Sequence, residues 1–310
     1  MPTAAARLPR RLPEMLSLAA LAGIVWWVWP RPSVEPPPRL QCGHPDASAV
    51  DQCFVPVAGG TFLMGAQADD PEAPGHDPAA QPHEGPPHEV TVTGFWITES
   101  EVIVGTYRAC VADGACREDE VKASGGFSTY YPAAEPFDAN RDLMPVNSIT
   151  WAGARDVCAW LGGRLPTEAE WELAARGTDG RRWPWGNQPQ CAMPPADDGF
   201  SRLRRSTVDA CEQDGPVRAR ALPNASPARV LGMAGNLWEW TADWYADDAY
   251  AHHASTDPRG PSTGDRRAQR GGSWTATSPE ELRATVRGGL DPDAQLNDVG
   301  LRCVIGGAGG

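Results

Sequence analysis

A single glutamate between two tryptophans is the residue whose type and setting could most readily do chemistry. Glu239 lies between Trp238 and Trp240, inside a glycine- and tryptophan-rich stretch, 232–245. Indole rings favour burial, and a buried carboxylate without a positive partner is costly. Two partners would satisfy it: a hard cation such as calcium, shared with nearby backbone carbonyls, or an arginine. The residues alone leave both open.

The cysteines could do redox or metal chemistry, but their setting favours disulfides. All eight follow the N-terminal apolar segment, and an even number in an exported chain indicates bridges. Proximity in the sequence suggests three pairs: Cys42–Cys53, Cys110–Cys116 and Cys191–Cys211. Cys110 and Cys116 could instead be a reactive pair, although a small local disulfide is the simpler interpretation. Proximity in the sequence suggests no partner for the last two cysteines, Cys158 and Cys303.

The histidines form no recognisable metal pattern. His76, His83 and His88 lie in or beside an acidic, proline-rich segment, 66–87, at spacings that fit neither one helix face nor a usual zinc site. We expect them to be solvated loop histidines. His252 and His253 are adjacent, so a helix or a strand would point them apart.

The composition is typical of a loop-rich exported protein. The chain has 310 residues and a formal net charge of −13, with 33 glycines and 31 prolines. This length suits one large domain or two small ones, and no internal repeat or second boundary is visible. The acidic balance argues against nucleic-acid binding, which needs a basic surface.

The N-terminus predicts a membrane segment at residues 1–30. Arginines precede an apolar run from Met15 to Trp29, which as a helix would span about 22 Å of a hydrocarbon core about 30 Å thick. Because tryptophans end the run and no clear cleavage site follows, we expect a signal-anchor, with a cleaved signal peptide as the alternative. A proline-rich linker, 31–52, would hold a domain, 53–305, on the periplasmic or extracellular side.

Local patterns predict few and short elements around these residues. Residues 54–65 indicate a strand, a glycine turn and a second strand, and the alternation at 89–93 indicates a half-buried strand. The segment 98–101 resembles a capping box that opens a helix through Cys110.

Two further helices have clearer boundaries. Thr150 can cap a helix that ends at Gly162. Thr167 and Glu170 form a capping box for a helix that Gly177 closes.

Three longer motifs carry a family resemblance. They are, in chain order, Gly163–Glu172 (GRLPTEAEWE), Gly232–Tyr245 and Arg270–Trp274 (RGGSW). Together they resemble the formylglycine-generating (sulfatase-modifying) enzyme domain, over residues 54–304. The resemblance implies one compact α+β domain of the C-type-lectin-like group, loop-rich, with few short helices and strands.

The resemblance implies a chemistry that this chain lacks the residues to perform. The enzyme oxidises a cysteine of a client sulfatase to formylglycine, using a cysteine pair shortly after the RGGSW motif. Soft thiolates hold Cu(I), and hard oxygen ligands cannot replace them. Here the corresponding positions fall within 276–281, and no cysteine occurs between Cys211 and Cys303. We therefore expect no catalytic residue, no copper and no formylglycine generation by that mechanism.

The resemblance also implies structural calcium and a fourth disulfide. One calcium site is implied at Gly232, Gly235, Leu237 and Glu239. A weaker second site is implied at Asp209 and Cys211, because an expected asparagine is replaced nearby. Family members of the eukaryotic type join cysteines at the positions of Cys158 and Cys303, and this bridge would stabilise the fold by roughly 3–5 kcal/mol.

Three functions are compatible with these observations. The missing thiolates favour a non-catalytic, membrane-tethered module that binds a protein segment or small ligand in the family's groove, for which Ser273, Trp274 and Arg287 are the candidate lining residues. The alternative is an oxidoreductase on the same scaffold with a different metal chemistry, as in iron-dependent relatives. The third is an envelope-assembly component without a ligand.

Overall fold

The computed structural model describes residues 34–37, 40–42, 52–123, 126–132, 134–136, 138–191, 211, 215–222 and 225–307. The expected membrane segment, most of the linker and Asp209 of the weaker calcium site lie outside these residues. Within this described part, no helix has the length and apolar character needed to span a bilayer.

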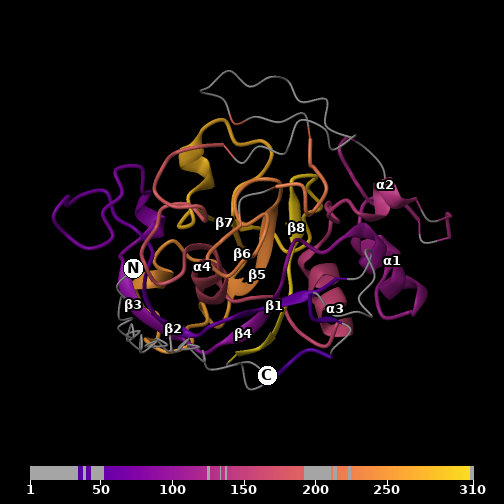
Figure 1. Ribbon diagram of the computed structural model, residues 1–310, viewed down its shortest axis with the longest axis horizontal. Coiled ribbons are helices and arrows are strands. Elements are labelled where there is room, and N and C mark those ends of the chain that lie inside the picture. The colour runs from indigo at the N-terminus through magenta and orange to yellow at the C-terminus, as the bar shows by residue number, and fades with distance from the viewer. Residues whose placement is uncertain are drawn as a thin grey trace, which may run out of the picture.

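The strands form three small sheets (Figure 1). One has the order β1-β4-β9, the second pairs β2 with β3, and the largest has the order β7-β6-β5-β8. Their bounds are β1 Phe54–Val57, β2 Gly60–Met64, β3 His88–Val92, β4 Phe95–Thr98, β5 Trp238–Trp244, β6 Arg267–Arg270, β7 Arg287–Leu290, β8 Val299–Leu301 and β9 Val304–Gly306.

The helices are short, and long connections fill the space between them and the sheets. The α-helices are α1 Val104–Ala112, α2 Ala139–Asp142, α3 Trp151–Trp160 and α4 Glu168–Arg176. Single 3₁₀ turns are η2 Pro82–Glu84, η3 Glu118–Glu120, η4 Ala249–Ala251 and η5 Pro279–Leu282. This confirms the expected loop-rich α+β architecture.

The expected strands at 54–65 and 89–93 are present, but the first two join different sheets. β1 pairs with β4, whereas β2 pairs with β3. The chain changes sheet at Gly59, where an added Cβ would lie 2.4 Å from the backbone nitrogen of Gly94. Only glycine therefore allows the two backbones to approach this closely.

Two of the three predicted helix starts are confirmed. The Thr150 side chain accepts a hydrogen bond from Gly153 N, and Thr167 and Glu170 form the full capping box of α4. The capping box at 98–101 is wrong. α1 begins at Val104 without a side-chain cap, because tertiary contacts use the Glu101 carboxylate elsewhere, as described below.

All four expected disulfides are present. Cys42–Cys53, Cys110–Cys116 and Cys191–Cys211 close short loops, and Cys158–Cys303 closes a separation of 145 residues. The last bridge is fully buried and ties α3 to the connection between β8 and β9. Four disulfides indicate an extracytoplasmic domain.

Candidate functional site

The Glu239 carboxylate is neutralised by an arginine. Glu239 lies on β5, and its two oxygens accept hydrogen bonds from Arg302 Nε and Nη2 at 2.5 and 2.7 Å. Trp171 Nε1 of α4 donates to the same carboxylate at 2.6 Å. All three residues are buried. Of the two partners that the sequence left open, the structure therefore supplies the arginine.

A second carboxylate beside this pair is left incompletely bonded. Glu101 is fully buried; one oxygen accepts from Asn236 Nδ2 at 2.8 Å, and Oε2 has no hydrogen-bond partner. It lies against Gly232, where an added Cβ would be 2.7 Å from either oxygen. Burial, followed by the charge of Glu239, raises the pKa of Glu101 to about 8. Glu101 was absent from the sequence-based candidates because its capping-box pattern suggested a different role.

These contacts change how a calcium ion would fit the first site. Glu239 already has its charge compensated, whereas the Glu101 oxygen is unpaired and lies beside the loop that contains Gly232, Gly235 and Leu237. An orphaned buried oxygen beside the Gly232 turn is a ligand of the kind that a hard cation prefers. The residues present therefore fit a cation at this loop, with Glu101 as the free carboxylate. Of the second site, only Cys211 lies among the described residues.

A second buried charge network lies between α4 and the large sheet. Arg287 pairs with Glu168 at 2.6 Å, and Arg270 bridges Glu168 and Glu172 at 3.3 and 2.5 Å. Burial opposes ionisation, but Arg287 and then Arg270 hold the pKa of Glu168 below its usual range. Arg287 is buried in this network, which corrects the expectation that it lines a groove with Trp274.

The RGGSW motif and the residue after it carry hydroxyls, directly before the positions 276–281 at which the enzyme would carry thiolates. The Ser273 hydroxyl lies 2.8 Å from that of Thr275 and donates to Asp298 at 3.3 Å. Burial raises the pKa of Asp298. Cys211 N donates to the Thr277 carbonyl at 3.3 Å, so the Cys191–Cys211 bridge borders this segment. All eight cysteines are in disulfides, so the chain offers no free thiol here.

An apolar surface lies next to these hydroxyls. Phe127 and Trp274 meet edge to face with ring centroids 4.8 Å apart, and Trp274 Nε1 donates to the Asn297 carbonyl. Phe127 and Leu296 are 46% and 45% exposed, and Val34 is the one other large apolar side chain exposed in the part of the chain that the structure describes. We call Phe127 and Trp274, with Leu296, which precedes the Asn297 that Trp274 contacts, the aromatic surface. The sequence carries no signal for Phe127 and Leu296, because neither lies in a periodic or motif-bearing segment.

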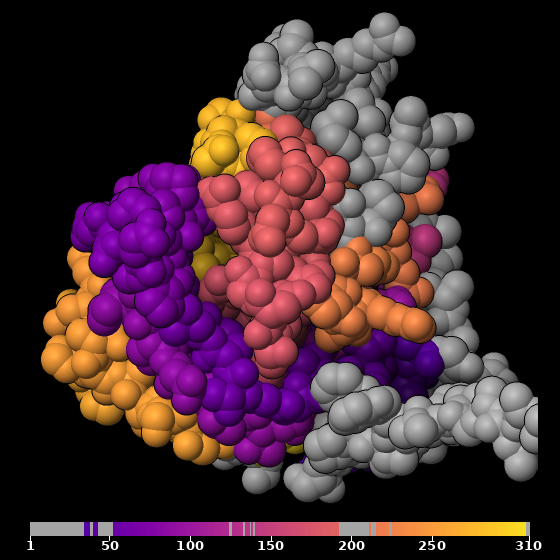
Figure 2. Space-filling view, turned by 60° about the vertical axis from the view of Figure 1, so that its left-hand side comes forward, coloured from indigo at the N-terminus to yellow at the C-terminus, as the bar shows by residue number. Residues whose placement is uncertain are grey.

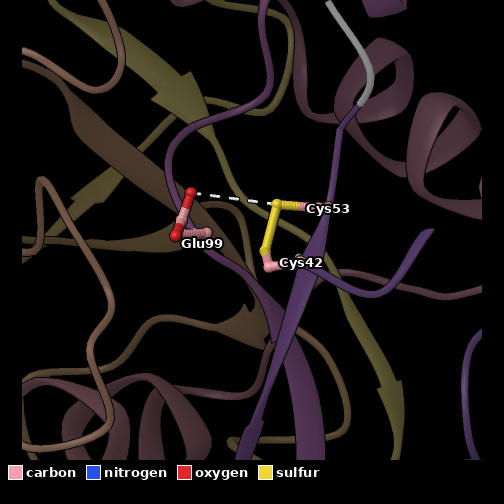
Figure 3. A group of neighbouring side chains, drawn as sticks. All are labelled: Cys42, Cys53 and Glu99. Carbon is pink, nitrogen blue, oxygen red and sulfur yellow. Dashed lines mark hydrogen bonds between the residues drawn. A yellow bond between two sulfur atoms is a disulfide. The ribbon is translucent and has the colours of Figure 1, made fainter. Parts of the chain in front are cut away.

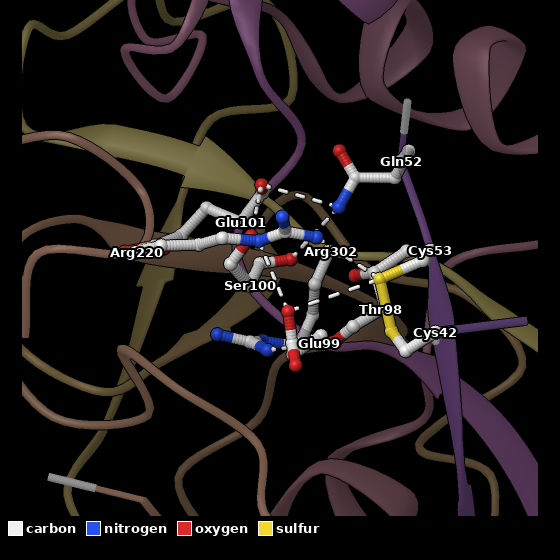
Figure 4. The surroundings of a disulfide bond; sticks show 9 residues. All are labelled: Cys42, Gln52, Cys53, Thr98, Glu99, Ser100, Glu101, Arg220 and Arg302. Carbon is white, nitrogen blue, oxygen red and sulfur yellow. Dashed lines mark hydrogen bonds and ion pairs between the residues drawn. A yellow bond between two sulfur atoms is a disulfide. The ribbon is translucent and has the colours of Figure 1, made fainter. Parts of the chain in front are cut away.

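The Cys42–Cys53 disulfide lies among charged groups. Arg220 Nη2 is 3.0 Å from Cys53 Sγ, and Arg220 also pairs with Glu99 at 3.0 Å (Figure 4). Cys42, Cys53 and Glu99 form the one group of three metal-ligating side chains found among the described residues (Figure 3). Because the two sulfurs are bonded to each other, this group is a structural bridge rather than a metal centre.

The histidines near the 66–87 segment are not solvated as expected. His76, His83 and His88 are each half-buried, and His88 packs against Tyr250 and His253. The segment, purple in Figure 2, lies beside the pink surface formed by residues near 180. Ion pairs between Asp77 and Arg182 and between Glu84 and Arg283 anchor it. Much of this acidic loop is therefore integrated into the fold.

Comparison with known proteins agrees with the motifs and the fold. The model of the sulfatase-modifying factor enzyme 1-like domain matches residues 44–306. A formylglycine-generating enzyme of Thermomonospora curvata is 32% identical, with 81% of this chain and 92% of the relative aligned. The mouse inactive C-alpha-formylglycine-generating enzyme 2 is also 32% identical, over 86% and 88%.

Solved structures support the fold. PvdO from Pseudomonas aeruginosa superimposes with a TM-score of 0.63 at 22% identity, covering 83% of this chain and 95% of that one. Treponema denticola variable protein 1 gives a TM-score of 0.51 at 20% identity, over 81% and 94%. The chain therefore belongs to the formylglycine-generating enzyme (sulfatase-modifying factor) domain family.

Proposed function

We propose that this protein is a non-oxidative member of its family that binds an extended protein segment on the aromatic surface. The observation that carries the proposal is the state of the cysteines. All eight are engaged in four disulfides, and none lies at 276–281. Without a thiolate pair, the chain has no soft ligands for Cu(I) in that segment. A relative of similar identity is itself named as inactive.

The aromatic surface supports binding rather than mere loss of activity. Large exposed apolar side chains that gather at one place are typical of interaction sites, and aromatic residues contribute most to binding free energy there. The exposed Thr275, next to Trp274 in the sequence, offers a hydroxyl to a peptide backbone, and the buried Ser273 hydroxyl orients it from a distance of 2.8 Å. A bound segment would therefore combine an apolar anchor with main-chain hydrogen bonds.

A calcium ion would have a structural role in this molecule. The loop carbonyls of Gly232, Gly235 and Leu237, together with Glu101, would hold it, while Glu239 stays paired with Arg302. The ion would compensate the unpaired Glu101 oxygen and order a stretch that has few regular hydrogen bonds. The N-terminal segment would tether the domain to the membrane, with the aromatic surface on the periplasmic or extracellular side.

Two assays on the full chain test this function. In the first, the chain is incubated with oxygen, copper and a cysteine-containing sulfatase peptide, and the peptide mass is followed. We expect no conversion of cysteine to formylglycine, whereas the Thermomonospora curvata enzyme converts the same peptide. Turnover by this chain would overturn the non-oxidative proposal.

The second assay locates the partner. A photoreactive phenylalanine analogue replaces Phe127 or Leu296 in the producing cell, and Arg155, which is exposed on α3, is the matched control position. We expect one defined protein adduct from the first two positions and none from the control. Identical adducts from all three positions, or no adduct from any, would contradict binding at this surface.

A further inference from the structure

Two half-buried histidines from distant parts of the sequence meet in the fold. His88 is the first residue of β3, and His253 follows η4. Their ring centroids are 5.2 Å apart with an angle of 74° between the planes. Tyr250 packs against both rings, at 5.2 and 4.9 Å. Nothing in the proposed binding function uses this pair.

Three of the four ring nitrogens are enclosed and have no hydrogen-bond partner. They are His88 Nε2, His253 Nδ1 and His253 Nε2. A neutral imidazole has one N–H donor and one lone pair, and burying either without a partner costs free energy. The two rings therefore carry unsatisfied bonding capacity, which waters or a ligand must fill.

The fourth nitrogen fixes the orientation of the His88 ring. His88 Nδ1 lies 3.0 Å from the carbonyl oxygen of Pro86. A carbonyl oxygen can only accept, so Nδ1 carries the proton and Nε2 presents its lone pair. This N–H to carbonyl contact is the arrangement that usually orients a metal-binding histidine.

We propose that His88 and His253 bind a late transition-metal ion, Zn(II) or Cu(I), through His88 Nε2 and one ring nitrogen of His253. With metal–nitrogen bonds of about 2.0 Å, two imidazoles on one tetrahedral ion have centroids roughly 5 Å apart. The observed separation matches this value. Water, a small ligand or a third side chain would fill the remaining coordination positions.

The surroundings of His253 favour a neutral imidazole. Burial lowers the pKa of His253 to about 4, which keeps the ring unprotonated at neutral pH. The charges of Glu168 and Arg287 act on it in opposite directions. Met64 lies directly opposite His88 in the antiparallel β2–β3 pair, so the two side chains project from the same face of this sheet. A thioether donor there would favour Cu(I) over Zn(II).

The first test is a Zn(II) titration of the full chain by calorimetry after removal of metal, with calcium in excess. We expect one equivalent of Zn(II) to bind, and binding to weaken at least tenfold in His88→Ala and in His253→Ala. His252→Ala is the matched control, because His252 is adjacent but exposed and pairs with Asp248. Unchanged binding in both alanine variants, or none in the native chain, would overturn the proposal.

A second measurement avoids variants that fail to fold. The chain has 6 histidines, so their ¹⁵N ring resonances can be resolved in the native protein. Zn(II) is expected to shift the resonances of two half-buried histidines and leave that of His252 in place. Shifts confined to exposed histidines would contradict the site.

A third titration, with Cu(I) in competition with a chelator, tests whether the Met64 thioether is a ligand of the site. Cu(I) binding that weakens at least tenfold in Met64→Leu supports a site completed by the thioether, and equal Cu(I) binding in Met64→Leu supports a site of two imidazoles. Neither result depends on the proposed peptide-binding function, so the two proposals can fail separately.

Discussion

The buried ion pair between Glu239 and Arg302 joins β5 to the end of β8. The guanidinium contacts both carboxylate oxygens, and it also donates to the Thr98 and Leu231 carbonyls at 3.2 and 2.9 Å. One side chain thus links the end of β8 to the end of β4 and to the stretch 231–239. Glu101 lies close enough for the Arg302 charge to act on it, which partly offsets the rise in the Glu101 pKa caused by burial and Glu239.

Removal of this arginine should strongly destabilise the domain. In Arg302→Leu, Glu239 stays buried without its counter-charge, and we expect a loss of about 3–5 kcal/mol in the free energy of unfolding. Urea unfolding measures this loss. The double variant Glu239→Gln with Arg302→Leu should recover part of it, because no charge is then left unpaired. As a control, Arg117→Ala breaks an exposed pair with Asp119 and should leave the unfolding midpoint unchanged.

The raised pKa of Glu101 predicts a pH dependence of stability. The unfolded carboxyl ionises near 4.5 and the folded one near 8, so the folded state binds the proton more tightly. Stability from this group is complete below pH 4.5 and is lost as the pH rises to about 8. We expect the metal-free chain to lose at least about 1.4 kcal/mol across this window, the equivalent of one pKa unit.

The Glu101→Gln variant tests the source of this dependence. Because glutamine does not ionise, the slope of unfolding free energy against pH between 5 and 8 should decrease in urea titrations with chelator present. Some slope should remain, since burial also raises the pKa of Asp243 to about 7. A slope identical to that of the native chain would show that Glu101 is not the titrating group.

Local signals in the sequence were enough to predict two of the helix caps and the three short disulfides. The caps at Thr150 and Thr167 depend on contacts within three residues, and the short bridges join cysteines close along the chain. The long Cys158–Cys303 bridge and the fold class came from the family resemblance. The two caps and the short bridges could be predicted without knowing how distant segments pack.

The errors arose where distant segments decide the role of a side chain. Glu101 was expected to cap a helix, but its side chain packs against Gly232 and accepts a hydrogen bond from Asn236. Arg287 was expected to line a groove, but in the structure it forms a buried ion pair with Glu168 of α4. Likewise, His88 was expected to be solvated because nothing near it in the sequence reveals the approach of residue 253.

The Cys158–Cys303 bridge should contribute more stability than the local bridges. In the chain-entropy model, closing 145 residues contributes about 3–5 kcal/mol, and closing 6 residues contributes about 2 kcal/mol. We therefore expect Cys158→Ala with Cys303→Ala to lower the urea midpoint more than Cys110→Ala with Cys116→Ala. Equal losses from the two double variants would show that native-state packing, rather than loop closure, sets the contribution of each bridge.

Calcium should stabilise the domain chiefly through Glu101. The unpaired Glu101 oxygen would gain a ligand, whereas Glu239 is already satisfied by Arg302 and Trp171. We expect 1 mM calcium to raise the thermal midpoint of the chelator-treated chain, and this increase to shrink markedly in Glu101→Gln. Magnesium, which prefers a smaller octahedral site, should have a weaker effect. A calcium-induced increase that is unchanged in Glu101→Gln would contradict this prediction, because it would show that Glu101 is not a ligand on which the stabilisation depends.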